Sequence, residues 1–417
     1  MTHASPSRPL HVAVIDEELP YPPNSGKRIR TLNLLRPLVR RHRITYIAYR
    51  GADAAETRAA AEYLAAQGIT PVLVDRVLPA KAGAMFYGRL MWNLLSPLPY
   101  SVQVHNSRAL RAKIRQVAAE HAIDLWQCEW TPYGESLAHV APGPWVTMAH
   151  NVESTIWRRY GERESNLLKR GYIHVQRRKY ERFERRMFAL ADRTIAVSSS
   201  DARIAEEQFG ARDVAVIDNG VDVAHFRPDG TPRDPYRALF LGSLDWRPNL
   251  DAVRFLLDHI FPTVVAREPR ARLSLVGRKP PAWLVKRAEE CPSVELVADV
   301  PDVRPYLRGC GAMVVPLRIG GGSRLKIIEA LAAECPVIST TIGAEGLPII
   351  AGAHYTEANA ASEIAAAMVD AMRQPERHRA IARQGRQVVI EHHDWSLLSR
   401  RLETLWLTHA GGNARAA

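Results

Sequence analysis

The sequence has 417 residues, with 56 Lys and Arg against 44 Asp and Glu, so the formal net charge is +12. Apolar residues make up 47% and charged residues 24% of the chain, a balance that excludes global disorder and suggests two or three globular domains. No apolar run approaches the roughly 18–20 residues that a membrane-spanning helix needs.

The N-terminal segment and the cysteines of the sequence predict a cytoplasmic protein. The first apolar run, from Leu10 to Ile15, is too short for the core of a signal peptide. The four cysteines are scattered and form no Cys-x-x-Cys pair, which suits a reducing compartment and argues against a structural zinc site or a disulfide framework. The basic excess favours an anionic partner: nucleic acid, a membrane surface or a phosphorylated substrate.

Short β-rich runs alternate with longer amphipathic stretches along nearly the whole chain. A first series of strands is expected at 12–16, 44–49, 71–75, 125–128, 145–149 and 194–198, and a second series at 215–218, 238–242, 273–277, 294–297, 312–316 and 337–340. Helices are expected between them, as at 28–41, 107–121, 250–267 and 324–334, with a last one at 396–407. Strands buried on both faces and alternating with helices indicate an α/β protein with parallel, doubly wound sheets.

One segment has the composition of a linker. Residues 219–237 (NGVDVAHFRPDGTPRDPYR) hold three prolines and two glycines between two βα series. We therefore expect an N-terminal Rossmann-like domain at 1–222, a C-terminal one at 223–394, and a terminal helix at 395–417 that packs back toward the first domain. Ligands of such sheets bind outside the carboxyl ends of the strands.

The segment 314–329, VVPLRIGGGSRLKIIE, carries the clearest chemical signal. A strand ends at Pro316, three glycines follow, and a helix begins near Ser323. Glycines allow close backbone approach and a helix N-terminus attracts phosphate, while Arg324 and Lys326 add positive charge where the helix dipole disfavours it. An anionic ligand would offset the repulsion between the helix dipole and these basic side chains. Glu329 could accept hydrogen bonds from two sugar hydroxyl groups. The alternative is a plain glycine-rich loop with solvated basic residues.

Several blocks in register resemble the family 4 retaining glycosyltransferases, also described as glycosyl transferases group 1. They are PNSG at 23–26, AHNVE at 149–153, ADRTIAVS at 191–198, VIDNGVDVAHFRP at 216–228, FLGSLDWRPN at 240–249, the GGGSRLKIIEALA loop at 320–332, and CPVISTTIGAEGL at 335–347. The resemblance spans nearly the whole chain. It implies the GT-B fold, with two Rossmann-like domains facing across a cleft, the first for the acceptor and the second for a nucleotide-sugar donor.

The resemblance also implies a set of site residues. Glu329 matches the family glutamate that binds the ribose hydroxyls, whereas the family's first glutamate falls on Gly321, which leaves the donor sugar open. Arg247 matches the first member of the basic pair for the pyrophosphate, and Lys326 or Arg324 the second. The implied donor-binding residues are Gly26, Gly242, Gly321, Gly322, Ser323, Arg324, Leu325 and Glu329.

His150 follows a strand in the N-terminal half and would face the cleft and touch the donor sugar. With Arg247 and Lys326 it completes the expected catalytic group. The alternative is a histidine that only ends a strand. Glu153 would either orient the imidazole or simply begin the next helix, and Ser25-Gly26 would either offer amides to the ligands or form an ordinary βα turn.

The predicted reaction follows from what the sequence lacks as well as from the resemblance. The sequence contains no Asp-x-Asp, His-Glu-x-x-His or Gly-x-Ser-x-Gly motif, so neither a metal site nor a cofactor is expected beyond the nucleotide-sugar co-substrate. We expect transfer of a hexose from a nucleotide diphosphate sugar to a hydroxyl acceptor, lipid-linked or part of a polysaccharide of the cell surface. The alternatives are a nucleotide-sugar epimerase or hydrolase, and a non-catalytic adaptor for membrane or nucleic acid; no nucleic-acid partner is expected for the enzyme.

Residues 85–100, from Met85 to Tyr100, concentrate apolar and aromatic side chains around a single charge, Arg89. With the basic excess, the segment suggests peripheral contact with an anionic membrane at the inner face of the cell membrane. The alternative is a buried helix and loop of the first domain. The charged stretch 163–193 would be one long helix, with a solvated face as its simplest role.

Overall fold

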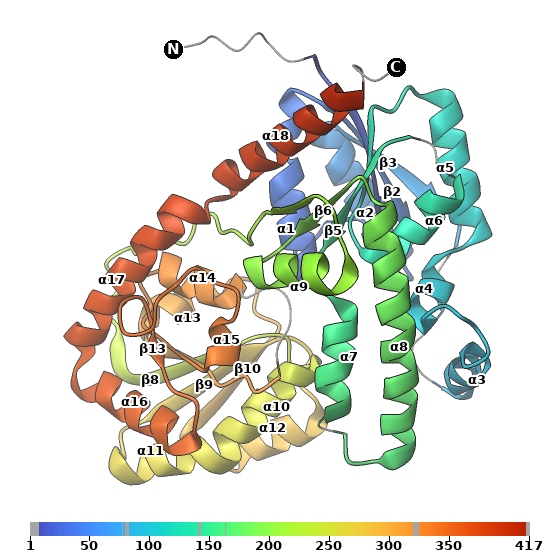
Figure 1. The fold of residues 1–417 in the computed structure, drawn as a ribbon. Helices are drawn as coiled ribbons and strands as arrows, with labels where there is room; N and C mark the ends of the chain where they lie inside the picture. Colours follow the sequence, from blue (N-terminus) through green and yellow to red (C-terminus); the bar gives the residue numbers. More distant parts are fainter. Residues whose placement is uncertain are drawn as a thin grey trace. The chain divides into compact units, whose positions relative to one another are not determined.

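The computed structural model of the chain describes residues 8–76, 78–79, 83–140, 143–162, 164–319 and 325–413. The described residues form two compact units (Figure 1). The first contains residues 8–218 and 396–413, and the second contains residues 219–319 and 325–395. The chain therefore leaves the first unit after Asp218 and returns to it at Ser396.

The first unit is built on a seven-stranded parallel sheet in the order β3-β2-β1-β4-β5-β6-β7. All six residues of β1 are buried, because helices cover both faces of the sheet. The strand order reverses between β1 and β4, which makes the carboxyl ends of these two strands the expected ligand position. The strands are β1 (His11–Asp16), β2 (Arg43–Tyr49), β3 (Ile69–Val74), β4 (Leu125–Cys128), β5 (Trp145–Ala149), β6 (Arg193–Ala196) and β7 (Val214–Val216).

One sequence prediction needs correction in this unit, and another needs a shorter range. The strand expected at 215–218 was placed in the second series, but β7 pairs in parallel with β6 and completes the first sheet. The charged stretch at 163–193 contains one long helix as expected, but α8 spans only Leu167–Leu190 and begins where the Asn166 side chain accepts a hydrogen bond from the Lys169 amide. Helix α7 packs beside α8, as Figure 1 shows.

The helices of the first unit are α1 (Gly26–Leu35), α2 (Ala54–Ala66), α3 (Ala84–Asn93), α4 (Tyr100–His105), α5 (Arg108–Glu120), α6 (Gly134–Val140), α7 (Glu153–Glu162), α8 (Leu167–Leu190), α9 (Ser199–Phe209) and α18 (Trp395–Asn413). Short 3-10 turns lie at Leu38–Arg40 and Thr131–Tyr133. Local sequence fixes the helix ends: in α9 the Ser198 hydroxyl accepts from the Asp201 amide, and Gly210 ends the helix in the left-handed region at φ 72°.

The last helix of the chain, α18, packs within the first unit. Trp406, fully buried, donates its indole N–H to Gln127 Oε1 at 2.8 Å. Glu403 Oε1 lies 2.9 Å from His42 Nε2, and the Ser399 hydroxyl donates to the Leu34 carbonyl at 2.8 Å. Residues up to 365 positions apart in the sequence thus share one core.

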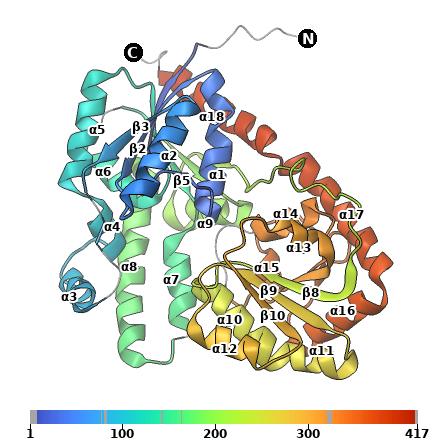
Figure 2. The ribbon, with the colours of Figure 1, turned by 180° about the vertical axis from the view of Figure 1, so that it is seen from behind.

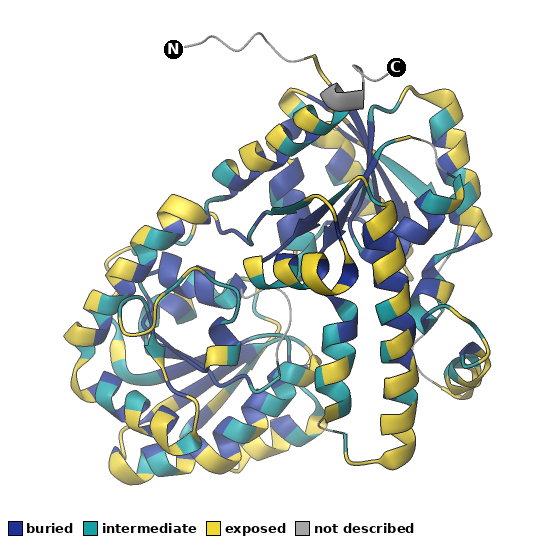
Figure 3. Cartoon of the chain, viewed as in Figure 1, coloured by how far each residue is buried: buried dark blue, intermediate teal, exposed yellow. Residues whose placement is uncertain are grey.

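The second unit is built on a six-stranded parallel sheet in the order β10-β9-β8-β11-β12-β13. Its strand order reverses between β8 and β11, so the carboxyl ends of these strands are the second expected ligand position. Figure 2 shows the sheet of this unit from behind, and Figure 3 shows that strands of both sheets are buried while the outer faces of the helices are exposed. The strands are β8 (Asp234–Leu241), β9 (Arg272–Gly277), β10 (Val294–Ala298), β11 (Cys310–Val315), β12 (Val337–Ser339) and β13 (Thr356–Glu357).

The helices of the second unit are α10 (Arg247–Phe255), α11 (Phe261–Arg267), α12 (Ala282–Glu289), α13 (Arg304–Gly309), α14 (Leu325–Ala332), α15 (Thr341–Ala344), α16 (Ala361–Arg373) and α17 (Pro375–His392). The helix expected at 250–267 is interrupted by a π-helical turn at Leu256–Ile260, just before Pro262, whose ring nitrogen has no hydrogen to donate to the preceding turn. None of the described helices is both long and apolar enough to cross a membrane.

Candidate active site

In the second unit, Gly242, Asn249 and Lys326 meet where β8 ends. The Lys326 ammonium donates to Asn249 Oδ1 at 2.9 Å, and Asn249 Nδ2 donates to the Ser243 carbonyl at 2.8 Å. A Cβ atom at Gly242 would lie 2.8 Å from both Lys326 Nζ and Asn249 Nδ2. The missing side chain of Gly242 leaves room for the close approach of these two side chains, which place a positive charge and an amide at the carboxyl end of the strand.

Lys326 and Glu329 lie three residues apart on α14, so they point to neighbouring positions on the helix. The Lys326 ammonium also lies 5.0 Å from the centre of the Phe240 ring. Burial raises the pKa of Glu329 to about 7, and the charge on Lys326 pulls it the other way. The Glu329 side chain is half-buried and not fully closed off from solvent, so a ligand could still reach its carboxylate.

The remaining residues expected at the donor site have different positions in the second unit. Arg247 is the first residue of α10 and is exposed, and Leu325 is the first residue of α14 and is buried. Arg278 joins the same end of the sheet, because its Nε donates to the Ser243 hydroxyl at 3.0 Å. Gly321, Gly322, Ser323 and Arg324, all expected to meet the donor, lie outside the described residues.

In the first unit, His150 lies directly after β5 and contacts Glu129, the residue after β4. His150 Nε2 is 3.2 Å from Glu129 Oε2, and both side chains are largely buried. The Glu129 carboxylate also accepts from the Thr31 hydroxyl at 3.0 Å and from Gln127 Nε2 at 2.5 Å. The partner of His150 is therefore Glu129 and not Glu153, which begins α7 and accepts from the Trp130 indole N–H at 2.9 Å.

The pKa values of this pair indicate its protonation state at neutral pH. Burial lowers the pKa of His150, and the hydrogen bond with Glu129 only partly opposes that effect. Burial alone would raise the pKa of Glu129, but hydrogen bonds from His150, Gln127 and Thr31 hold the pKa below its ordinary value. A neutral imidazole thus faces an ionised carboxylate, so Nε2 carries the proton and Nδ1 is an acceptor.

A second pair, the buried Asp16 and the half-buried Lys27, lies at the carboxyl end of β1. Lys27 follows Gly26 in the first turn of α1 and forms an ion pair with Asp16, which also accepts from the Tyr46 hydroxyl at 2.6 Å. Burial raises the pKa of Asp16 to about 6, with the Lys27 charge opposing. Ser25 caps α1 by accepting from the Arg28 amide at 3.3 Å, and Gly26 begins the helix.

Sequence reasoning missed Asp16, Lys27, Glu129 and Asn249. A signal existed for the first and third, because each is an acidic residue directly at or after the end of an apolar strand. No comparable signal marked Lys27, whose meeting with Asp16 depends on how α1 leaves the sheet. In the described part of the chain, no three His, Cys, Asp or Glu side chains gather as metal ligands would.

Two family models match the sequence and together span most of it. Residues 24–225 match the model described as Glycosyltransferase Family 4, and residues 235–374 match the model described as Glycosyl transferases group 1. Two doubly wound parallel sheets are the architecture of the GT-B class of glycosyltransferases. The chain belongs to glycosyltransferase family 4, within the glycosyl transferases of group 1.

Solved structures share the fold at low sequence identity. Sucrose-phosphate synthase (tll1590) from Thermosynechococcus elongatus is 18% identical, with a TM-score of 0.69 over 95% of this chain and 98% of that chain. Anabaena Alr3699/HepE, solved in complex with UDP-glucose, is 16% identical, with a TM-score of 0.64 over 95% and 99%. WaaG, a glycosyltransferase involved in lipopolysaccharide biosynthesis, is 15% identical, with a TM-score of 0.64 over 94% and 98%. A comparison with curated protein sequences gives no match.

Proposed function

We propose that the protein is a retaining, metal-independent glycosyltransferase that moves a hexose from a nucleotide diphosphate sugar to a hydroxyl acceptor. The observation that carries the proposal is the group formed by Gly242, Asn249 and Lys326, with Glu329 on the same helix. It offers a positive charge for a diphosphate and a carboxylate for the vicinal hydroxyls of a ribose.

Each residue has a distinct part in this proposal. Lys326, with Arg247, offsets the charge that develops on the departing diphosphate, which is where electrostatic stabilisation lowers the barrier most. Glu329 binds the ribose, and its carboxylate must be ionised to accept hydrogen bonds from two hydroxyl groups. His150 contacts the donor sugar, with Glu129 holding the imidazole in one tautomer. Retention of configuration rests on the resemblance, and no protein nucleophile is assigned.

The test is a thermal-shift screen against nucleotide sugars, followed by a transfer assay. UDP-glucose comes first in the screen, because the structure of Anabaena Alr3699/HepE contains it. Nucleoside diphosphate should then be released faster when a hydroxyl acceptor is added. Release at one rate with and without acceptors, including lipid-linked ones, would support the alternative of a hydrolase, and an absence of stabilisation by every nucleotide sugar would support a non-catalytic adaptor.

We further propose that α3 brings the enzyme to an anionic membrane, where a lipid-linked acceptor of cell-surface glycan synthesis would be found. The alternative of a buried helix conflicts with exposed fractions of 78% for Met85, 72% for Trp92 and 81% for Leu95. Tyr87 and Met91 are exposed as well, and Asn93 is the buried residue that holds the helix, since Gln176 Nε2 donates to Asn93 Oδ1 at 2.8 Å. Exposed apolar and aromatic side chains on one short helix are typical of interfacial anchors.

A further inference from the structure

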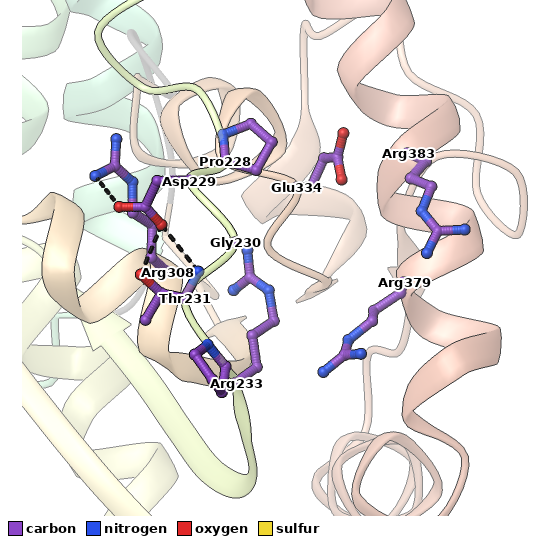
Figure 4. Close-up of a pocket in the computed structure, with 10 residues that line it drawn as sticks. Pro228, Asp229, Gly230, Thr231, Arg233, Arg308, Glu334, Arg379 and Arg383 are labelled. Atoms are coloured by element: carbon purple, nitrogen blue, oxygen red, sulfur yellow. Dashed lines mark hydrogen bonds and ion pairs between the residues drawn. The ribbon is translucent and has the colours of Figure 1, made fainter.

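One cavity of the second unit is lined by charged side chains that the proposed glycosyl transfer does not use. It has a volume of about 270 Å³ and lies between the segment that leads into β8 and helix α17 (Figure 4). Its walls are formed by Pro228, Asp229, Gly230, Thr231, Pro232, Arg233, Arg308, Glu334, Arg379 and Arg383.

The cavity and the candidate donor site lie at opposite ends of the strands of this sheet. Arg233 immediately precedes β8, whose far end is followed by Gly242, and Arg308 lies two residues before β11. The strands of this sheet are all parallel, so the cavity is at their amino ends and the Gly242–Lys326 group is at their carboxyl ends. The eight residues of β8 span about 25 Å, which is too far for one small ligand to reach both places.

The charges on the cavity wall are unbalanced. Four arginines face two carboxylates, and one of these, Asp229, is already bound by Arg308 Nη1 at 2.7 Å and by the Thr231 hydroxyl at 2.6 Å. Arg233 is held by backbone carbonyls, donating to Leu307 and Ala333 at 2.6 Å each. These bonds fix the guanidinium in place but bring no negative charge to balance it.

Two of the arginines come from one face of α17. Arg379 and Arg383 are four residues apart, an arrangement in which like charges repel. Arg379 pairs with Glu376 at 2.6 Å, whereas Arg383 is exposed and has no ion pair among the described residues. In Figure 4 both side chains extend from α17 on the side that faces Arg233 and Thr231.

We propose that this cavity binds a small soluble phosphorylated anion with at least two negative charges, the size of a pyrophosphate or a sugar phosphate. Guanidinium groups pair with phosphate oxygens through two parallel hydrogen bonds, and a ligand with two charges would balance the excess on the wall. The volume holds a group of that size and is walled on both sides. Because the cavity is remote from Lys326, occupancy there would add a second ligand to the enzyme without displacing the donor.

The test uses sodium pyrophosphate as the probe and reads out individual arginines of the whole protein. Phenylglyoxal modification followed by mass spectrometry should show Arg379 and Arg383 reacting about tenfold more slowly with saturating pyrophosphate, as expected when one charge-assisted bond covers each group. Arg400 and Arg401, exposed on α18, are the controls and should react at an unchanged rate at equal ionic strength. Added UDP-glucose should leave the protection intact.

Paired variants give a second, independent measurement by titration calorimetry. Arg379→Ala with Arg383→Ala should weaken one class of pyrophosphate binding about tenfold or more, while Arg400→Ala with Arg401→Ala, which removes the same charge, should leave it unchanged. Equal protection of all four arginines, or wild-type binding in the cavity variant, would overturn the proposal. Protection by anionic vesicles but not by pyrophosphate would also overturn it, since the ligand would then be a lipid surface.

Discussion

Replacing Gly242 by alanine should separate donor binding from folding. The new Cβ atom would lie 2.8 Å from Lys326 Nζ and from Asn249 Nδ2, closer than carbon and nitrogen approach in folded proteins. Both obstructing atoms are at the ends of side chains, and the glycine has no left-handed backbone to strain. The side chains can therefore move aside, and stability should stay within about 1 kcal/mol of wild type.

The cost of Gly242→Ala should appear in the affinity for the donor. The displaced ammonium loses its 2.9 Å hydrogen bond to Asn249 Oδ1 and its position in the proposed diphosphate site. Loss of one charge-assisted interaction is worth about 1.5–3 kcal/mol, so binding should weaken by roughly ten- to a hundredfold. Calorimetric titration with the nucleotide sugar found in the thermal-shift screen measures this directly.

Two further glycines of the second unit provide matched controls. A Cβ at Gly277 would lie 1.9 Å from the Gly242 backbone carbonyl, which cannot move aside, so Gly277→Ala should destabilise folding by about 1–3 kcal/mol. A Cβ at Gly309 would meet no atom within 4 Å, so Gly309→Ala should leave both folding and donor binding unchanged. Wild-type donor affinity in a folded Gly242→Ala variant would refute the role given to the Lys326 ammonium.

Four other expectations concern single groups of the two units. Affinity for the nucleotide sugar found in the thermal-shift screen should rise from about pH 6 to about pH 8 as Glu329 ionises, because its pKa is raised to about 7, and Glu329→Gln should flatten that profile in calorimetry. Glu129→Gln should lower the pKa of His150 further, since the carboxylate raises it, and an NMR titration that found no change would contradict the pairing. Lys326→Met should reduce turnover about a hundredfold at saturating donor with little change in melting temperature. Met91→Ser with Trp92→Ser should reduce cosedimentation with anionic liposomes, whereas Leu167→Ser with Leu168→Ser, equally exposed on α8, tests whether any apolar pair has the same effect.

The sequence predicted the strands well because period and burial are local properties. The strands expected at 125–128 and 145–149 coincide with β4 and β5, where short and mostly apolar runs are followed by polar residues. The two-residue strand β13 was missed, because Thr356 and Glu357 carry no apolar pattern of their own and pair only at the edge of β12. The assignment of 215–218 to the wrong sheet has a similar cause, since pairing with β6 is a tertiary choice.

The geometry of the candidate site was predictable where its residues are close in sequence and not where it depends on tertiary contacts. Lys326 and Glu329 share one helix, so their spacing alone placed them together. Glu129 lies 21 residues from His150 and meets it only because β4 and β5 are neighbours in the sheet. The exposure of α3 could not be predicted from the sequence either. An apolar helix has the same sequence pattern whether it packs in a core or contacts a membrane.

The position of α18 within the first unit has a consequence for how the protein is made. Gln127, His42 and Leu34 are synthesised long before α18, the helix whose residues contact all three. At roughly 5–20 residues per second, the second unit takes on the order of 10–35 s to synthesise. During that interval the nascent first unit has all of its own strands but not α18, so part of its core stays open to solvent and to chaperones.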